Sequence, residues 1–204
     1  MSIYILSAPS GAGKTTVSNE FLSKVNTIKR VITVTTRKPR EGEENNKDYI
    51  FISKESFLKK IQEGAFLEYA EVYGNLYGTP KDQVESNESQ GIDSLLVIDV
   101  QGARSIRNIY TDCISIFLLP PSIEALLDRM KKRGSEDENL ELRIKKVKEE
   151  ICALSEFDYV IVNDNIKTCV EELITIYKAS KLTTKEFLKN PRVVDPQMMS
   201  IFKA

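Results

Sequence analysis

A run of small and polar residues near the N-terminus, S-A-P-S-G-A-G-K-T-T at positions 7–16, has the composition of a phosphate-binding loop. In such a loop successive backbone N–H groups face inward and the next helix presents its positive end, so that a polyphosphate binds there. Lys14 would neutralise the β- and γ-phosphates, and the Thr15 hydroxyl would be one Mg²⁺ ligand. The residues expected to surround the nucleotide phosphates are Ala8, Pro9, Ser10, Gly11, Ala12, Gly13, Lys14 and Thr15.

The loop departs at one position from the pattern G-x-x-x-x-G-K-[ST], because Ala8 stands where the first glycine belongs. Alanine accepts a positive φ poorly, so we expect Ala8 in an ordinary region of backbone space. Gly11 and Gly13, which would face the phosphates, are present. The alternative interpretation is a glycine-rich turn that carries an exposed Lys14.

Two groups of arginines lie in segments that are distant in the sequence: Arg37 and Arg40, then Arg133 and Arg143, with Arg129 close to the second group. Arginine matches phosphate with a planar, two-pronged set of donors. On its own, each group is typical of a solvated charged face. Beside a phosphate-binding loop, the two groups indicate transfer of a phosphoryl group, whose dispersed negative charge must be matched from several directions.

The composition narrows the possible chemistry. The chain of 204 residues has no histidine, which excludes Ser-His-Asp catalysis, His-ligated zinc and a histidine general base. Its net charge is −1 and no apolar run approaches the ~20 residues of a membrane span, so we expect neither nucleic-acid nor membrane binding. No leader precedes the first strand, which favours a cytoplasmic protein. Cys113, Cys152 and Cys169 lie in apolar patterns and are expected to be reduced core residues.

The elements around the loop fit an α/β fold. The apolar run 3–6 predicts a buried strand before the loop, and residues 16–25 predict the helix after it. Residues 30–35 are β-branched and predict a further strand. The continuous apolar run 94–99 predicts a central parallel strand that ends in Asp99. Open α/β sheets bind ligands at this carboxyl edge of their strands.

Residues 33–89 predict a small strand-rich insertion with a polar face. Ser53 is expected to cap a helix that ends near Gly64, and Gly74-Asn75 predicts a hairpin turn. Thr79 is expected to cap the next helix, with Pro80 at its first position.

The C-terminal half continues the alternation of strands and helices. The pattern predicts a strand at 114–119, a helix capped by Ser122, a charged joint at 131–138, a long helix at 140–154, a strand at 159–162, a helix after the turn at 163–165, and a short helix at 184–188. The predicted architecture is therefore one domain with a parallel sheet flanked by helices.

With its residues laid out, the chain resembles the guanylate kinases over residues 2 to about 180. The resemblance rests on ordered motifs at family spacing: S-A-P-S-G-A-G-K-T, T-V-T-T-R-K-P-R-E-G-E, K-D-Y-I-F, F-L-E-Y-A, Y-G-N-L-Y-G-T, I-D-V-Q-G, the R-G joint and V-N-D. It implies the fold of phosphate-loop nucleoside monophosphate kinases, with an inserted GMP-binding subdomain and a lid. It also implies Mg²⁺-dependent phosphoryl transfer from ATP to GMP or dGMP, in purine nucleotide metabolism.

The resemblance further implies a division of the chain. A core would comprise residues 1–32, 90–122 and 155–180, a GMP-binding subdomain 33–89, a lid 123–154 and a C-terminal tail 181–204. It implies no oligomeric state.

Site residues follow from the same motifs. The GMP phosphate would be held by Arg37, Arg40, Tyr49 and Tyr77, and the guanine by Thr33, Glu68, Thr79 and Asp99. Catalysis would use Lys14, Arg40, Arg133 and Arg143, the ATP side would add Arg129 and Asn163 to the loop, and the metal would contact Thr15 and Asp99. Two positions depart from the family: Thr33 replaces the usual serine, and Val97 stands where relatives often carry an acid.

Alternatives remain at several of these positions. Glu68 could be an exposed strand acid, Thr79 could only cap a helix, and Tyr49 and Tyr77 could be ordinary core rings with wetted hydroxyls. Two other functions also compete: a scaffold module of the same fold that binds phosphopeptides without activity, and a kinase for a different nucleoside monophosphate. The intact Gly13-Lys14-Thr15 opposes the first alternative, and Glu68 with the R-K-P-R loop opposes the second.

Overall fold

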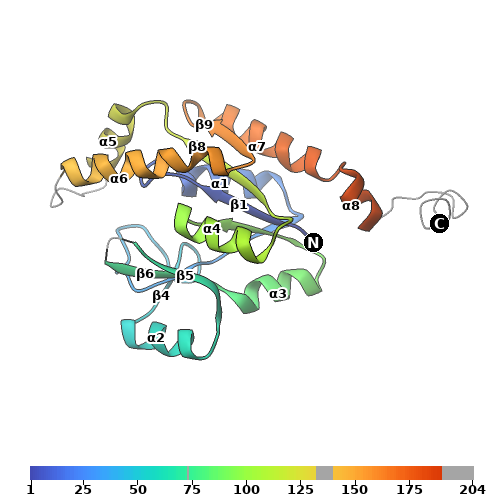
Figure 1. Ribbon diagram of the computed structural model, residues 1–204, viewed down its shortest axis with the longest axis horizontal. Coiled ribbons are helices and arrows are strands. Elements are labelled where there is room, and N and C mark those ends of the chain that lie inside the picture. The colour runs from blue at the N-terminus through green and yellow to red at the C-terminus, as the bar shows by residue number, and fades with distance from the viewer. Residues whose placement is uncertain (73, 132–139, 190–204) are drawn as a thin grey trace, which may run out of the picture.

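The computed structural model describes residues 1–72, 74–131 and 140–189 of the chain. Two sheets with their helices occupy the upper and lower parts of Figure 1. The elements are β1 (Ile3–Ser7), α1 (Lys14–Lys24), β2 (Ile28–Val31), β3 (Val34–Thr35), β4 (Ile50–Phe51), α2 (Lys54–Gln62), β5 (Phe66–Val72), β6 (Asn75–Pro80), α3 (Lys81–Ser89), β7 (Asp93–Val97), α4 (Val100–Ile109), β8 (Ile114–Leu119), α5 (Ile123–Lys131), α6 (Leu140–Cys152), the short helix η1 (Ala153–Glu156), β9 (Tyr159–Val162), α7 (Ile166–Ser180) and α8 (Thr184–Lys189).

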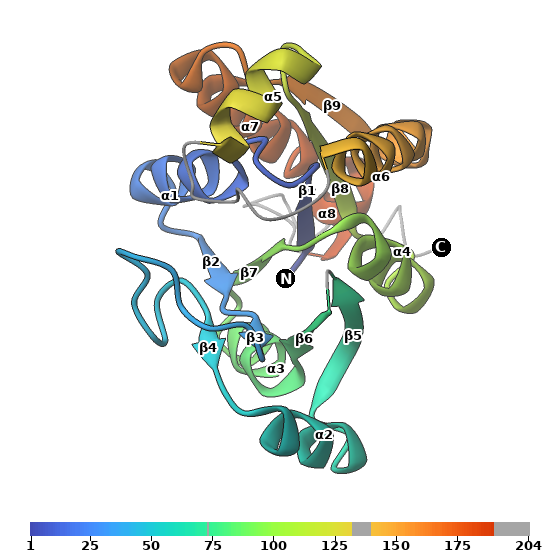
Figure 2. The ribbon, with the colours of Figure 1, turned by 90° about the vertical axis from the view of Figure 1, so that its left-hand side faces the viewer.

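The larger sheet is parallel throughout, in the order β2-β7-β1-β8-β9. Figure 2 shows helices on both of its faces. The chain moves from β1 outward to β2 and β7 on one side and to β8 and β9 on the other, so the topological switch point lies at β1. Ligands of open α/β sheets bind at the carboxyl ends of strands beside such a point. The predicted α/β class, with a parallel sheet flanked by helices, is confirmed.

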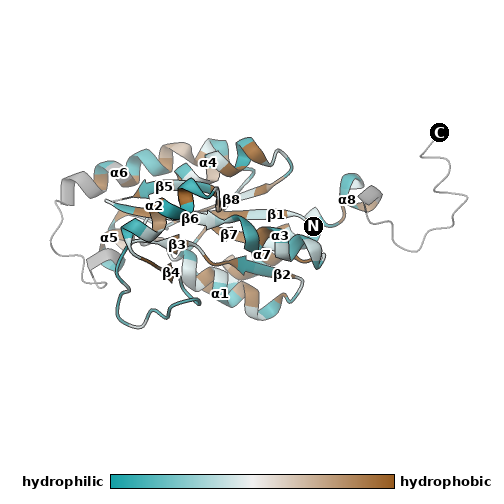
Figure 3. Ribbon diagram, turned by 90° about the horizontal axis from the view of Figure 1, so that it is seen from below, coloured by the Kyte–Doolittle hydropathy of each residue, from teal (hydrophilic) through white to brown (hydrophobic). Residues whose placement is uncertain are grey.

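The strands of this sheet divide their side chains between two cores. Tyr4 and Leu6 pack with α1 and α7 on one face, whereas Ile3 and Ile5 pack with α3 and α4 on the other. This alternation follows from the two-residue period of a strand. In Figure 3 hydrophobic residues are found on both strands and helices, while the long loop between β3 and β4 is hydrophilic.

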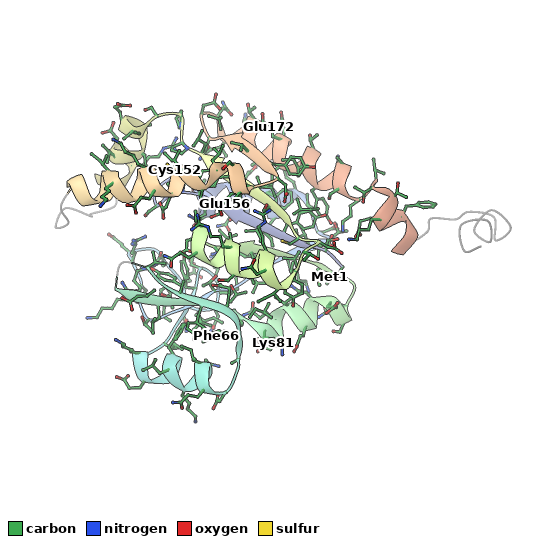
Figure 4. The ribbon with its side chains drawn as sticks, viewed as in Figure 1. Met1, Phe66, Lys81, Cys152, Glu156 and Glu172 are labelled. Carbon is green, nitrogen blue, oxygen red and sulfur yellow. The ribbon has the colours of Figure 1, made fainter. Side chains whose placement is uncertain are left out.

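The smaller sheet has the order β4-β3-β6-β5 and is built entirely from strands between residues 34 and 80. Strands β5 and β6 form the predicted antiparallel hairpin, and Gly74 has a φ of 73°. Asn75, which was expected in the turn, is instead the first residue of β6 and pairs with Val72. Phe66, the first residue of β5 (labelled in Figure 4), stacks on Phe57 of α2 with ring centroids 4.6 Å apart. This stack fixes α2 against the hairpin.

The prediction of one strand over residues 30–35 is wrong. Strand β2 belongs to the larger sheet and β3 to the smaller one, with a break between them. At the break, the side chain of Gln83 accepts a hydrogen bond from the Ile32 N–H at 2.7 Å and donates one to the Ile32 carbonyl at 3.3 Å. Because a distant side chain takes both backbone groups of Ile32, the chain can leave one sheet and enter the other.

Helix caps were mostly predictable. The side chains of Ser53, Ser122 and Asn165 accept backbone N–H bonds at the starts of α2, α5 and α7. The predicted cap at Thr79 is wrong: Pro80 occupies the N-cap of α3, which has no side-chain cap, and the Thr79 hydroxyl bonds elsewhere.

The cysteines are all free thiols, but the expectation of three core residues is only partly correct. Cys169 is buried and Cys113 half-buried, whereas Cys152 is exposed at the last residue of α6. None of the helices in the described part of the chain combines the length and apolarity that crossing a bilayer requires.

Candidate functional site: a cleft between the two sheets

A cleft of about 720 Å³ lies between the carboxyl edge of the larger sheet and the face of the smaller one. It is therefore lined by segments that are far apart in the sequence. The predicted site residues that line this cleft are Pro9, Ser10, Gly11, Gly13, Lys14, Thr15, Thr33, Arg37, Arg40, Tyr49, Glu68, Tyr77 and Asp99.

The phosphate-binding loop joins β1 to α1 at one end of this cleft. Gly11 and Gly13 have φ values of 86° and 99°, which only glycine adopts without strain. Ala8 is absent from the residues with positive φ, and Asn46 is the one non-glycine with such a φ in the described chain, so the expected ordinary backbone at Ala8 is confirmed. The Lys14 ammonium lines the cleft and donates to the Ala8 carbonyl.

Two predicted ATP-side residues lie beneath the loop rather than on the cleft wall. Asn163, which follows β9 and is buried, donates from its amide to the Ala12 carbonyl at 2.7 Å. Arg129 of α5 donates to the same carbonyl at 3.3 Å and to the Asn163 carbonyl at 3.2 Å. A Cβ on Gly13 would lie 2.4 Å from the Asn163 amide nitrogen, so the Asn163 side chain packs directly against the loop and leaves no room for a larger residue at position 13. Ala8 and Ala12 are buried behind the cleft as well.

At the other end of the cleft, one arginine lies beside a pair of tyrosine rings, Tyr49 just before β4 and Tyr77 on β6. The Arg37 guanidinium lies 5.3 Å from the centroid of the Tyr49 ring, and the Tyr49 and Tyr77 ring centroids are 6.0 Å apart. Arg37 donates to both carboxylate oxygens of Glu43, at 2.8 and 2.9 Å. Arg40 is exposed at the rim. This arrangement leaves a rigid guanidinium facing a cavity, as anion binding requires.

Glu43 lines the cleft and was missed by the sequence interpretation. It also accepts the Arg40 N–H at 2.7 Å, so one carboxylate fixes both arginine-bearing positions of the loop. Although burial opposes ionisation, the pKa of Glu43 is lowered by the hydrogen bonds from Arg37 and Arg40, so it stays charged. The available signal was an acid within six residues of two arginines in one polar loop.

Glu68 provides a buried carboxyl on the wall of the cleft. Its side chain belongs to β5, is 8% exposed, and accepts a hydrogen bond from the Thr79 hydroxyl at 2.5 Å. Burial and the nearby Asp99 carboxylate raise the pKa of Glu68 to about 7, against the opposing effect of the Thr79 hydrogen bond. Thr79 is thus buried behind Glu68 and orients it. Glu68 is not the exposed strand acid of the alternative interpretation.

Asp99 and Thr15 place oxygen atoms on the cleft wall near the loop. Asp99 Oδ1 caps α4 by accepting the Gly102 N–H at 2.8 Å. A hydroxyl and a carboxylate are hard oxygen donors of the kind that Mg²⁺ takes alongside substrate phosphates and waters. Val97 also lines the cleft, and its apolar side chain can supply no metal ligand there.

Two predicted arginines cannot be placed against the cleft. Arg133 lies outside the described residues, and Arg143 belongs to α6 but its side chain is outside the described part. Their proposed catalytic role and the lid they would belong to therefore stay predictions.

A phosphate-binding loop facing a second, guanidinium- and carboxylate-lined pocket across one cleft defines the fold class of phosphate-loop nucleoside monophosphate kinases. The family model described as guanylate kinase matches residues 1–180. The chain belongs to the guanylate kinase family, as its motifs predict.

Individual relatives agree. A guanylate kinase of Wolbachia pipientis is 43% identical over 195 residues, covering 95% of this chain and 96% of the relative. A guanylate kinase of Clostridium tetani is 46% identical over 180 residues, covering 88% and 86%. The crystal structure of guanylate kinase from Anaplasma phagocytophilum superimposes with a TM-score of 0.77 at 34% identity, covering 95% and 96%.

Proposed function

We propose that this protein transfers the γ-phosphoryl group of ATP to GMP, giving ADP and GDP. The observation that carries the proposal is the single cleft with a phosphate-binding loop at one end and Arg37, Arg40 and the buried Glu68 toward the other. The loop supports binding of ATP. Arginines and tyrosine hydroxyls support binding of the acceptor phosphate, and the Glu68 carboxylate suits guanine, which presents N1–H and an exocyclic amine as adjacent donors.

The chemistry fits a chain that has no histidine. The nucleophile is an oxygen of the GMP phosphate, which is largely ionised at neutral pH because its second pKa is about 6. It attacks the γ-phosphorus while the bond to the β–γ bridging oxygen breaks and ADP leaves, so no general base is needed. The protein contributes positioning and charge: the loop amides and Lys14 stabilise the transferred group, and Arg37 and Arg40 hold the acceptor.

Thr15 and Asp99 are the residues that would hold Mg²⁺, which when bound supplies positive charge to the β- and γ-phosphates. Within the described residues, no group of three or more acidic or cysteine side chains surrounds a common point. Mg²⁺ needs only a few ligands from the protein when nucleotide phosphates and waters supply the others.

The test is a coupled assay of ADP release with GMP, dGMP, AMP, UMP and dTMP as acceptors. We expect turnover with GMP and dGMP that exceeds turnover with AMP by about 10⁴, because a site built to accept two guanine donors rejects a base that lacks them. Preference for another monophosphate, or phosphopeptide binding with no turnover, would contradict the proposal.

The affinity for GMP should depend on pH through Glu68. With a pKa of about 7 in the free site, the carboxylate that accepts the guanine donors is present above pH 7 and lost below it. We expect KM for GMP to be lowest near pH 8 and to rise about tenfold at pH 6. The measurement is KM for GMP across pH 6–9 at saturating ATP.

Protonation of the GMP phosphate also changes KM for GMP, in a separate step near pH 6. The control is therefore Glu68→Gln, in which only the phosphate step should remain. A wild-type profile identical in shape to that of the variant would show that Glu68 does not titrate in this range.

A further inference from the structure

Gly102 is an unusual residue for its position. It lies in the first turn of α4, is buried, and has no positive φ that would require glycine. Glycine in a helix is about 1 kcal/mol less favourable than alanine. The backbone of Gly102 therefore does not explain why glycine stands there.

The space around Gly102 supplies the explanation. A Cβ at this position would lie 3.0 Å from Glu68 Oε2, 3.2 Å from its carboxyl carbon and 3.3 Å from Oε1. All three nearest atoms thus belong to the buried carboxyl in the cleft. Real Cβ contacts are rarely so close, so the carboxyl of Glu68 would have to move by a few tenths of an ångström.

Neither side of this contact can move without loss. Glu68 Oε1 is held by the Thr79 hydroxyl at 2.5 Å, so a displaced carboxyl strains that bond. On the helix side, Ala103 and Ile106 are buried in the core between α4 and the sheet, and Asp99 caps the helix through the Gly102 N–H. Arg104 further pairs with Glu156, which lies beside α4 in Figure 4.

We infer that Gly102 is a positioning residue for the guanine pocket. Because Gly102 has no side chain, the Glu68 carboxylate can lie between Thr79 and α4, where it can accept hydrogen bonds from guanine. The inference rests on the proposed function. The residue acts through Glu68 and touches no reacting atom. It also lies next to two acids of the pocket, since its N–H donates to Asp99 and a Cβ added to it would meet the Glu68 carboxyl.

The test is Gly102→Ala, with Asn108→Ala as the matched control because Asn108 is exposed on the same helix. We expect Gly102→Ala to raise KM for GMP about tenfold, which corresponds to 1.4 kcal/mol, while KM for ATP stays within about twofold. Discrimination between GMP and IMP, which lacks the exocyclic amine, should fall. The control should change none of these values.

A double-mutant cycle separates the pocket role from a general structural one. In a Glu68→Ala background the space is open, so adding Gly102→Ala should leave KM for GMP unchanged. If Gly102→Ala alone does not fold, folding of the double variant would still demonstrate the conflict with Glu68. Unchanged KM and GMP/IMP selectivity in Gly102→Ala, or equal effects in both backgrounds, would overturn the inference. Absence of GMP turnover in the parent protein would instead refute the proposed function.

Discussion

Replacement of Lys14 by Met should reduce kcat by about 10³-fold and leave GMP binding nearly unchanged. Lys14 lines the loop end of the cleft, whereas Arg37, Arg40 and Glu68, which are proposed to bind GMP, come from the smaller sheet and its loops. The ammonium therefore supplies charge to the phosphates in transfer, and its loss removes an interaction that matters most in the transition state. Turnover is measured by ADP release, and GMP binding by calorimetry without ATP.

A matched control is available on the same helix. Lys24 lies at the end of α1, is exposed and pairs only weakly with Glu20 at 3.2 Å, so Lys24→Met removes the same charge far from the loop. It should retain parental kcat. If Lys14→Met lost turnover and GMP affinity to the same extent, the separation of donor and acceptor ends would be refuted.

The sequence predicts local structure well where local rules decide it. The strands 114–119 and 159–162 are reproduced as β8 and β9, and Ser53 and Asn165 cap their helices as expected. Each of these depends on neighbours within a few residues: apolar runs bounded by turns, or a side chain that meets its own backbone.

The errors arise where a distant residue decides. Ile32 has a strand-forming sequence on both sides, but Gln83, 51 residues away, takes its backbone groups and the strand breaks. Thr79 has the local sequence of a helix cap, but Glu68 on the paired strand offers its hydroxyl a buried acceptor. At both positions the local sequence favours the predicted structure, but a hydrogen bond to a side chain far away in the sequence overrides that preference.

The structure brings most of the predicted site residues to one cleft, but the side chains that hold them in place were not all predicted. The family motifs included Arg37 and Glu68, and a guanidinium and a carboxylate suit a phosphate and a guanine. They gave no role to Glu43 or Gly102, since a carboxylate that orients an arginine, or a missing side chain that leaves space, is recognised only from distances. Arg129 and Asn163 are a further case in which the sequence named the residues but not their contacts. Both were predicted on the ATP side, and both donate hydrogen bonds to the Ala12 carbonyl of the loop.

Replacement of Glu68 by Gln should lower kcat/KM for GMP by about 10²- to 10³-fold. The amide keeps the volume of the carboxyl but offers one acceptor where guanine has two donors, and each lost charge-assisted hydrogen bond costs about 1.5–3 kcal/mol. An amide also matches adenine, which pairs an amine donor with an acceptor nitrogen. The ratio of GMP to AMP turnover should therefore fall further than the GMP rate itself. Steady-state assays with both acceptors measure these two quantities.

Folding and recognition can be separated in this variant. Because burial raises the pKa of Glu68 to about 7, the ionised carboxyl opposes folding above that pH, and its contribution to stability is present at low pH and lost as pH rises. Glu68→Gln should thus be at least as heat-stable as the parent at pH 8 while binding GMP less well. Glu71→Gln, on an exposed position of the same strand, should alter neither property. A Glu68→Gln protein that kept its preference for GMP over AMP would remove this carboxylate from guanine selection.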